Sequence, residues 1–97
     1  MSSAYVIADV KVADPDKYRQ YQALTPQAVA AAGGEFVVRG GRTETLEGDW
    51  RPNRVVVLKF ASYDAAKAFY ESALYRQARE TRAGATESFN MILVEGL

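Results

Sequence analysis

The sequence predicts an α+β fold with the element order β-α-β-β-α-β and a four-stranded antiparallel sheet. Four segments rich in β-branched residues alternate with helical segments that begin at capping residues. The second and third β segments follow one another with no helix between them, which is typical of a central hairpin. The length of 97 residues fits a single domain, 1–97. Together these observations indicate the ferredoxin-like arrangement, with both helical segments on one face of the sheet.

The first half of the chain predicts one strand followed by one long helix. Residues 4–12 are rich in β-branched residues, Asp9 and Lys11 alternate with Val10 and Val12, and the segment is expected to form the strand. The helix begins at Pro15, a residue that suits the first helical position, and a Gly-Gly pair at 33–34 ends it. Pro26 lies inside this helix and has no N–H to donate, so we expect either a kink or a restart with Thr25 as cap.

The second half of the chain supplies the remaining elements. We expect strands at 35–39, 54–61 and 86–95, a further β-like segment at 42–48, and helical runs from 63 and from 72. Ser62 and Ser72 can cap the two helical runs, with a bend between them. Residues 48–53 contain Gly, Asp, Pro and Asn and are the clearest turn signal in the chain.

The predicted strands carry apolar residues on both faces. In strand 4–12, Tyr5 and Ile7 alternate with Val6 and Ala8. Helices on one face leave the other face as an exposed apolar patch, and such a patch normally marks a partner surface. We therefore predict a homodimer in which two sheets pack face to face about a two-fold axis.

The composition argues against several classes of function. The chain has no cysteine and no histidine, which removes thiol chemistry, the usual metal and haem ligands and the commonest general base. Twelve basic and twelve acidic residues give zero net charge, which argues against nucleic-acid binding. No apolar run approaches the roughly 18 residues of a membrane span, and no secretion signal is visible. We expect a cytoplasmic protein with no metal, no cofactor and no membrane partner.

Six stretches along the chain carry a resemblance to a known family. They read AYVIADVKVADPDKY, AAGGEFVVRGG, LEGDW, RVVVLKFAS, AFYES followed by ALY, and NMILVEG. Together they resemble a widespread bacterial family catalogued as domain of unknown function 1330, in the dimeric α+β barrel superfamily. The resemblance implies the fold and the dimer, and it implies no reaction, because the family has no settled activity. Other branches of the superfamily include cofactor-less monooxygenases, muconolactone isomerases and haem-dependent enzymes, whose ligands generally lie between sheet and helices.

A cleft between the sheet and the helices is the candidate ligand site. Arg39 would hold an anionic or carbonyl oxygen, and Tyr21 and Asn90 would orient the ligand. Tyr18 would line the same cleft, whose apolar body and few polar groups are typical of a small-molecule site. Asp9 is the one candidate for a catalytic base, provided that it faces the helices.

Each candidate also has a structural interpretation. We favour the tyrosines as core residues, and Gly40 with Gly41 more often marks a bend in a hairpin than an anion site. For Asp9 we favour a salt bridge to the partner subunit or a hydrogen bond at the rim of a dimer. Trp50 lies in a polar turn and either closes over a pocket or packs on the partner subunit, with Arg54 at the rim; we favour the dimer contact.

Two functions therefore stay open. In the first, a homodimer binds a small anionic or carbonyl-bearing organic molecule in the cleft, with cofactor-independent chemistry as an option. In the second, the chain is a non-enzymatic structural or regulatory dimerisation module without a ligand site. The second hypothesis predicts no cavity above a few tens of cubic ångströms between sheet and helices.

Overall fold

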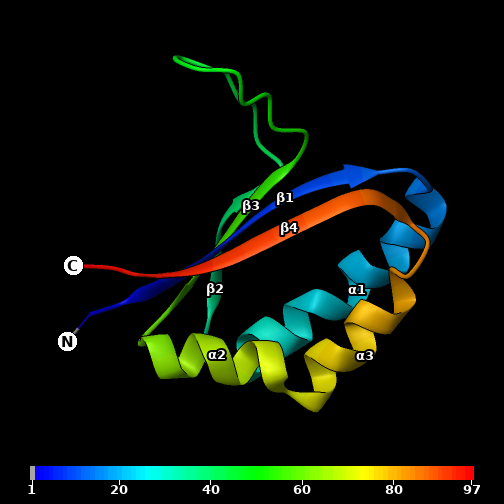
Figure 1. Ribbon diagram of the computed structural model, residues 1–97. Helices are drawn as coiled ribbons and strands as arrows, with labels where there is room; N and C mark the ends of the chain where they lie inside the picture. Colours follow the sequence, from blue (N-terminus) through cyan, green and yellow to red (C-terminus); the bar gives the residue numbers. More distant parts are fainter. Residues whose placement is uncertain (1) are drawn as a thin grey trace.

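The computed structural model describes residues 2–97 as one four-stranded antiparallel sheet with three helices on one side of it (Figure 1). The elements are β1 (Ala4–Val12), α1 (Pro15–Ala31), β2 (Glu35–Arg39), β3 (Val55–Phe60), α2 (Tyr63–Glu71), α3 (Ala73–Thr81) and β4 (Thr86–Glu95). The strand order is β2-β3-β1-β4, which leaves β2 and β4 as edge strands. The predicted ferredoxin-like arrangement is confirmed. None of the helices within residues 2–97 has the length and apolar character needed to cross a membrane.

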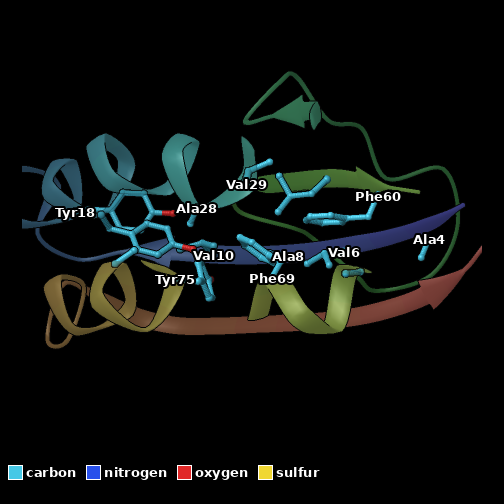
Figure 2. Close-up of a cluster of buried hydrophobic side chains, with 14 of the residues drawn as sticks. Ala4, Val6, Ala8, Val10, Tyr18, Ala28, Val29, Phe60, Phe69 and Tyr75 are labelled. Atoms are coloured by element: carbon cyan, nitrogen blue, oxygen red, sulfur yellow. Dashed lines mark hydrogen bonds between the residues drawn. The ribbon is translucent and has the colours of Figure 1, made fainter. Parts of the chain in front are cut away.

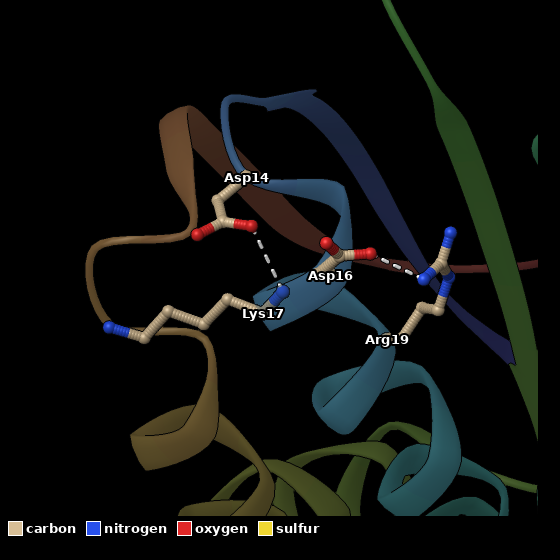
Figure 3. A network of polar contacts seen from close by, with 4 residues as sticks. All are labelled: Asp14, Asp16, Lys17 and Arg19. Carbon is tan, nitrogen blue, oxygen red and sulfur yellow. Dashed lines mark hydrogen bonds and ion pairs between the residues drawn. The ribbon is translucent and has the colours of Figure 1, made fainter.

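Side-chain caps start the three helices where the sequence predicts them. The Asp14 carboxylate accepts a backbone N–H from the first turn of α1, and Figure 3 shows this contact. Asp16 lies in the same turn and pairs with Arg19, at the helix end where negative charge is favourable. Ser62 and Ser72 cap α2 and α3 in the same way. The extended backbone of Ser72 also separates these two helices.

α1 continues through Pro26 as a single helix, so the predicted restart at Thr25 is wrong. The proline leaves the carbonyl of Gln22 without its helical donor. The Arg39 guanidinium from the end of β2 donates to that oxygen at 3.0 Å. The Thr25 hydroxyl donates to the carbonyl of Tyr21 at 2.7 Å and caps nothing. A side chain of the sheet therefore satisfies the acceptor that the proline exposes.

The core lies between the helices and the sheet face that they cover (Figure 2). β1 contributes every second residue to it, namely Ala4, Val6, Ala8 and Val10. The rings of Phe60, Phe69 and Tyr75 follow one another with centroid separations of 5.1 and 4.4 Å. Such aromatic pairs contribute about 0.5–1.5 kcal/mol each beyond their burial. This row ties both short helices to β3.

The opposite face of the sheet is not covered by any helix within residues 2–97 (Figure 1). The strand register places Ile7 of β1 between Val57 of β3 and Ile92 of β4. Ile92 is 57% exposed, and Val94 further along β4 is 41% exposed. Apolar residues on both faces of the sheet, as predicted, therefore leave an apolar row open to solvent. We call this side of the sheet the open face.

The predicted β-like segment at 42–48 is not a strand. It belongs to an extended arm, residues 41–53, which projects from the sheet on the side away from the helices (Figure 1). The β2–β3 pairing ends where the Gly40 N–H donates to the carbonyl of Val55 at 2.8 Å. Beyond this point no strand within residues 2–97 pairs with the segment, so the β propensity of its residues does not produce a strand. The arm exposes two large apolar side chains, Leu46 (86%) and Trp50 (63%).

A substitution at Gly34 tests the packing between the end of α1 and the core. A Cβ at Gly34 would lie 2.4 Å from the ring of Phe60, which is fully buried. Gly34→Ala should therefore lower the free energy of unfolding by about 1–3 kcal/mol, measured by urea denaturation. Gly41→Ala is the matched control, because a Cβ there meets nothing within 4 Å. Equal stability of the two variants would contradict this packing.

Candidate functional site

An apolar cleft lies between α1 and the helix-facing side of the sheet. α1 packs against α3 and against the core residues of the sheet, and a small space remains beside Tyr18 and Tyr21. Each strand supplies part of the wall: Val10 from β1, Phe36 from β2, Val56 from β3 and Phe89 from β4. The enclosed space is about 30 Å³, enough for about one or two water molecules.

Two arginines lie at the opening of this cleft, beside the polar side chains of α1. Arg39 stands opposite Val56 in the β2–β3 pair, and Arg54 comes two residues before Val56. Because side chains alternate along a strand, both arginines project to the helix-facing side. Arg54 also borders an outer groove of about 250 Å³ along the first turns of α1, next to Tyr18. The cleft is therefore apolar inside and cationic at its opening.

Arg39 lies at the cleft, as predicted, and its side chain contacts the protein itself. Its guanidinium donates to the carbonyl of Gln22 and lies over the ring of Phe36, 4.5 Å from the centroid. These contacts close the edge between β2 and α1. One of its donors is therefore committed to the protein itself.

Arg54 lies in the cleft and not with Trp50 on the open face, which corrects the predicted dimer-rim position. Its guanidinium packs against Gly40, where a Cβ would lie only 2.2 Å from Nη1. Its Nε is buried and finds no hydrogen-bond partner within residues 2–97. The two ion pairs seen in this part of the chain involve neither Arg54 nor Arg39. Arg54, Val56 and Leu58 are every second residue in the sequence. This spacing already indicates that Arg54 lies on the same side of the sheet as Val56 and Leu58.

Tyr18 and Tyr21 line the cleft as neutral hydroxyl groups. Burial raises the pKa of Tyr21 and that of Tyr75, and the two hydroxyls share a buried hydrogen bond of 2.6 Å. Burial also raises the pKa of Tyr18, although the nearby Arg54 guanidinium opposes the increase. At neutral pH these groups donate or accept hydrogen bonds and do not act as bases.

Asp9 and Asn90 lie outside the cleft, contrary to expectation. They stand opposite each other in the β1–β4 pair and project to the open face. The two Asp9 carboxylate oxygens accept from Trp50 Nε1 at 3.1 Å and from the backbone N–H of Asn53 at 2.9 Å. Asp9 therefore anchors the base of the arm, and it cannot serve as a base for a ligand held between sheet and helices.

The family profile described as Domain of unknown function (DUF1330) matches residues 3–97. The chain belongs to the DUF1330 family. The polar groups that line its cleft are guanidinium, phenol and amide groups, and a ligand could contact each of them. Within residues 2–97 of this DUF1330 chain, no group of three His, Cys, Asp or Glu side chains is arranged to hold a metal ion.

Solved structures similar to the DUF1330 chain share its fold. A protein of unknown function from Rhodopseudomonas palustris is 22% identical, with a TM-score of 0.74 over 99% of this chain and 83% of that chain. A dimeric ferredoxin-like protein of unknown function from Thermobifida fusca is 18% identical, with a TM-score of 0.66 over 99% and 92%. A Nitrosomonas europaea protein, named provisionally as an antibiotic biosynthesis monooxygenase, is 21% identical, with a TM-score of 0.59 over 98% and 90%. No curated protein matches the chain significantly.

Removal of the Asp9 carboxylate tests its role as the anchor of the arm. Trp50 is the single tryptophan, so its fluorescence reports on the arm alone. Asp9→Ala removes both acceptors and should lower the fluorescence anisotropy of Trp50, because the indole is no longer held to the sheet. Asp49→Ala removes an exposed carboxylate next to Trp50 and should leave the anisotropy unchanged. An unchanged anisotropy in Asp9→Ala would show that the arm is held by other contacts.

Proposed function

We propose that this DUF1330 protein binds a small organic molecule with an apolar body and an anionic or carbonyl oxygen. The observation that supports this function most is the pair of guanidinium groups at the opening of an otherwise apolar cleft. Neither arginine has an acidic partner in the part of the chain that the structure describes. An apolar wall takes up the body of a ligand, while a guanidinium provides directed donors for its oxygen atoms.

The size of the cleft sets a condition on binding. The enclosed space of about 30 Å³ admits only groups of about the size of water, so a larger ligand needs more room. Arg54 borders both this space and the outer groove of about 250 Å³. Movement of this one side chain would join the two spaces. In the proposed complex the apolar end of the ligand points inward and its oxygen atoms stay at the opening.

Binding is the function that the cleft supports, and catalysis is not part of the proposal. Asp9, the predicted base, projects to the other side of the sheet. The titratable groups that border the cleft are tyrosines and arginines. The tyrosines are protonated at neutral pH because burial raises the pKa of Tyr18 and of Tyr21.

We also propose that the protein is a homodimer in which two open faces pack together. The apolar row Ile7, Val57 and Ile92 supports this arrangement, since a two-fold axis matches the same apolar patch on both subunits. The similar protein from Thermobifida fusca is described as dimeric. Leu46 and Trp50 on the arm would extend the contact beyond the edge of the sheet.

A second candidate function is a dimerisation module that binds no ligand. The narrow enclosed space favours it, because about 30 Å³ lies within the few tens of cubic ångströms that this hypothesis predicts. The two functions share the dimer and differ only in whether the cleft opens to a ligand.

Thermal unfolding in the presence of small organic acids, amides and ketones separates these two functions. A ligand at 100 times its dissociation constant should add about 2.7 kcal/mol of stability and raise the melting temperature by several degrees. Ala8→Ile should abolish this increase, because Ala8 borders the enclosed space and the larger side chain fills it. Ala23→Ile on the exposed side of α1 is the control and should retain the increase. An absence of stabilisation across the panel would favour the dimerisation module.

A charge on the open face tests the dimer. Ile92→Glu should give a monomer in sedimentation velocity at micromolar concentration, because dimerisation would bury the new carboxylate in an apolar contact. The side chain of Ile92 is exposed in the single chain, so the monomer should keep its fold. Gln77→Glu adds one negative charge on the exposed side of α3 and should leave the dimer intact. A wild-type protein that sediments as a monomer would contradict the proposal.

A further inference from the structure

The two arginines at the cleft differ in the contacts that they make with the rest of the protein. Arg39 donates to the Gln22 carbonyl, an acceptor left without its helical donor by Pro26. It also lies over the ring of Phe36. These contacts hold the guanidinium of Arg39 as part of the wall.

Arg54 differs from Arg39 because one of its nitrogens is buried and makes no hydrogen bond in the described part of the chain. The Nε atom is buried without an acceptor in the range 2–97. A buried donor without a partner costs about 1–3 kcal/mol, and a charged donor costs more. The guanidinium lies against Gly40 and near the Tyr18 hydroxyl, while its Nε remains unsatisfied. An acceptor supplied by a ligand would remove that cost.

Gly40 is the residue that makes room for this arrangement. Its φ of +70° is in the left-handed region that favours glycine. A Cβ at this position would lie 2.2 Å from Nη1 and 2.6 Å from Cζ of Arg54. With a Cβ at this position the guanidinium would have to shift away from the backbone. Gly40 therefore has a packing role as well as a conformational one.

We infer that Arg54 selects a carboxylate as the polar group of the ligand and that Gly40 provides the space for the guanidinium of Arg54. This inference rests on the proposed function. Nε and one Nη form a planar pair of donors that matches the two oxygens of a carboxylate. A neutral carbonyl would satisfy one donor and leave the positive charge unpaired. The expected ligand class is a monocarboxylic acid with an apolar body.

Benzoate and benzamide test this inference, because they share a ring and differ in charge. Calorimetric titration should show wild-type protein binding benzoate at least about tenfold tighter than benzamide. Arg54→Met should weaken the binding of benzoate at least about tenfold and change the affinity for benzamide less than about twofold. Arg54→Lys keeps the charge without the planar pair of donors and should retain part of the preference. Arg42→Met on the arm removes an exposed arginine as a matched control and should behave as wild type.

Gly40→Ala independently tests whether the space at Gly40 positions the guanidinium of Arg54. This variant should weaken the binding of benzoate and leave the affinity for benzamide within about twofold of wild type. Circular dichroism and the melting temperature check that it is folded. Equal binding of both compounds to wild type and to Arg54→Met would overturn the role of Arg54 and leave the cleft as a binding site. A failure of wild type to bind benzoate, with binding of amides or ketones in the thermal-unfolding panel, would overturn the inference and leave the proposed function standing; an absence of binding across benzoate, benzamide and that panel would overturn both.

Discussion

The alternation of side chains along β1 is the constraint on which the rest of the structure depends. β1 is a central strand, and its successive residues point to opposite sides of the sheet. Ala8 and Val10 face the helices and form the floor of the cleft. Ile7 and Asp9 face the other way, where one contributes to the apolar row and the other anchors the arm. The proposed ligand site and the proposed dimer contact therefore lie on opposite faces of the same strand.

The cleft exists because two local irregularities are compensated across the fold. Pro26 removes a helical donor, and Arg39 replaces it from the sheet, which fixes the edge of the cleft. Gly40 leaves out a side chain, and the guanidinium of Arg54 fills the space. Only the second compensation leaves a buried donor unused. This difference underlies the proposed roles, in which Arg39 belongs to the wall and Arg54 binds the carboxylate.

The fold could be predicted from the sequence because its signals are local. Capping by Ser62 and Ser72 and the two-sided apolar strands need no knowledge of distant contacts. The continuation of α1 through Pro26 could not be predicted in this way, since the donor that compensates the proline is Arg39, far along the chain. The segment 42–48 has β propensity, but no neighbouring strand pairs with it.

The candidate site was predictable only in part. Tyr18 and Tyr21 follow the apolar spacing of α1, which brings them to the cleft. The parity of β1 already placed Asp9 opposite to Ala8 and Val10, so its position on the open face was available from the pattern. The contact between Arg54 and Gly40 has no local signal, because it depends on how the hairpin closes.

A crystal structure of the protein with para-bromobenzoate would locate the bound ligand, since anomalous scattering identifies the bromine. We expect the bromine between α1 and the sheet and the carboxylate beside Arg54, with the open face packed against a second copy. Bromine in the groove between α2 and β4, or on the open face, would contradict the proposed site.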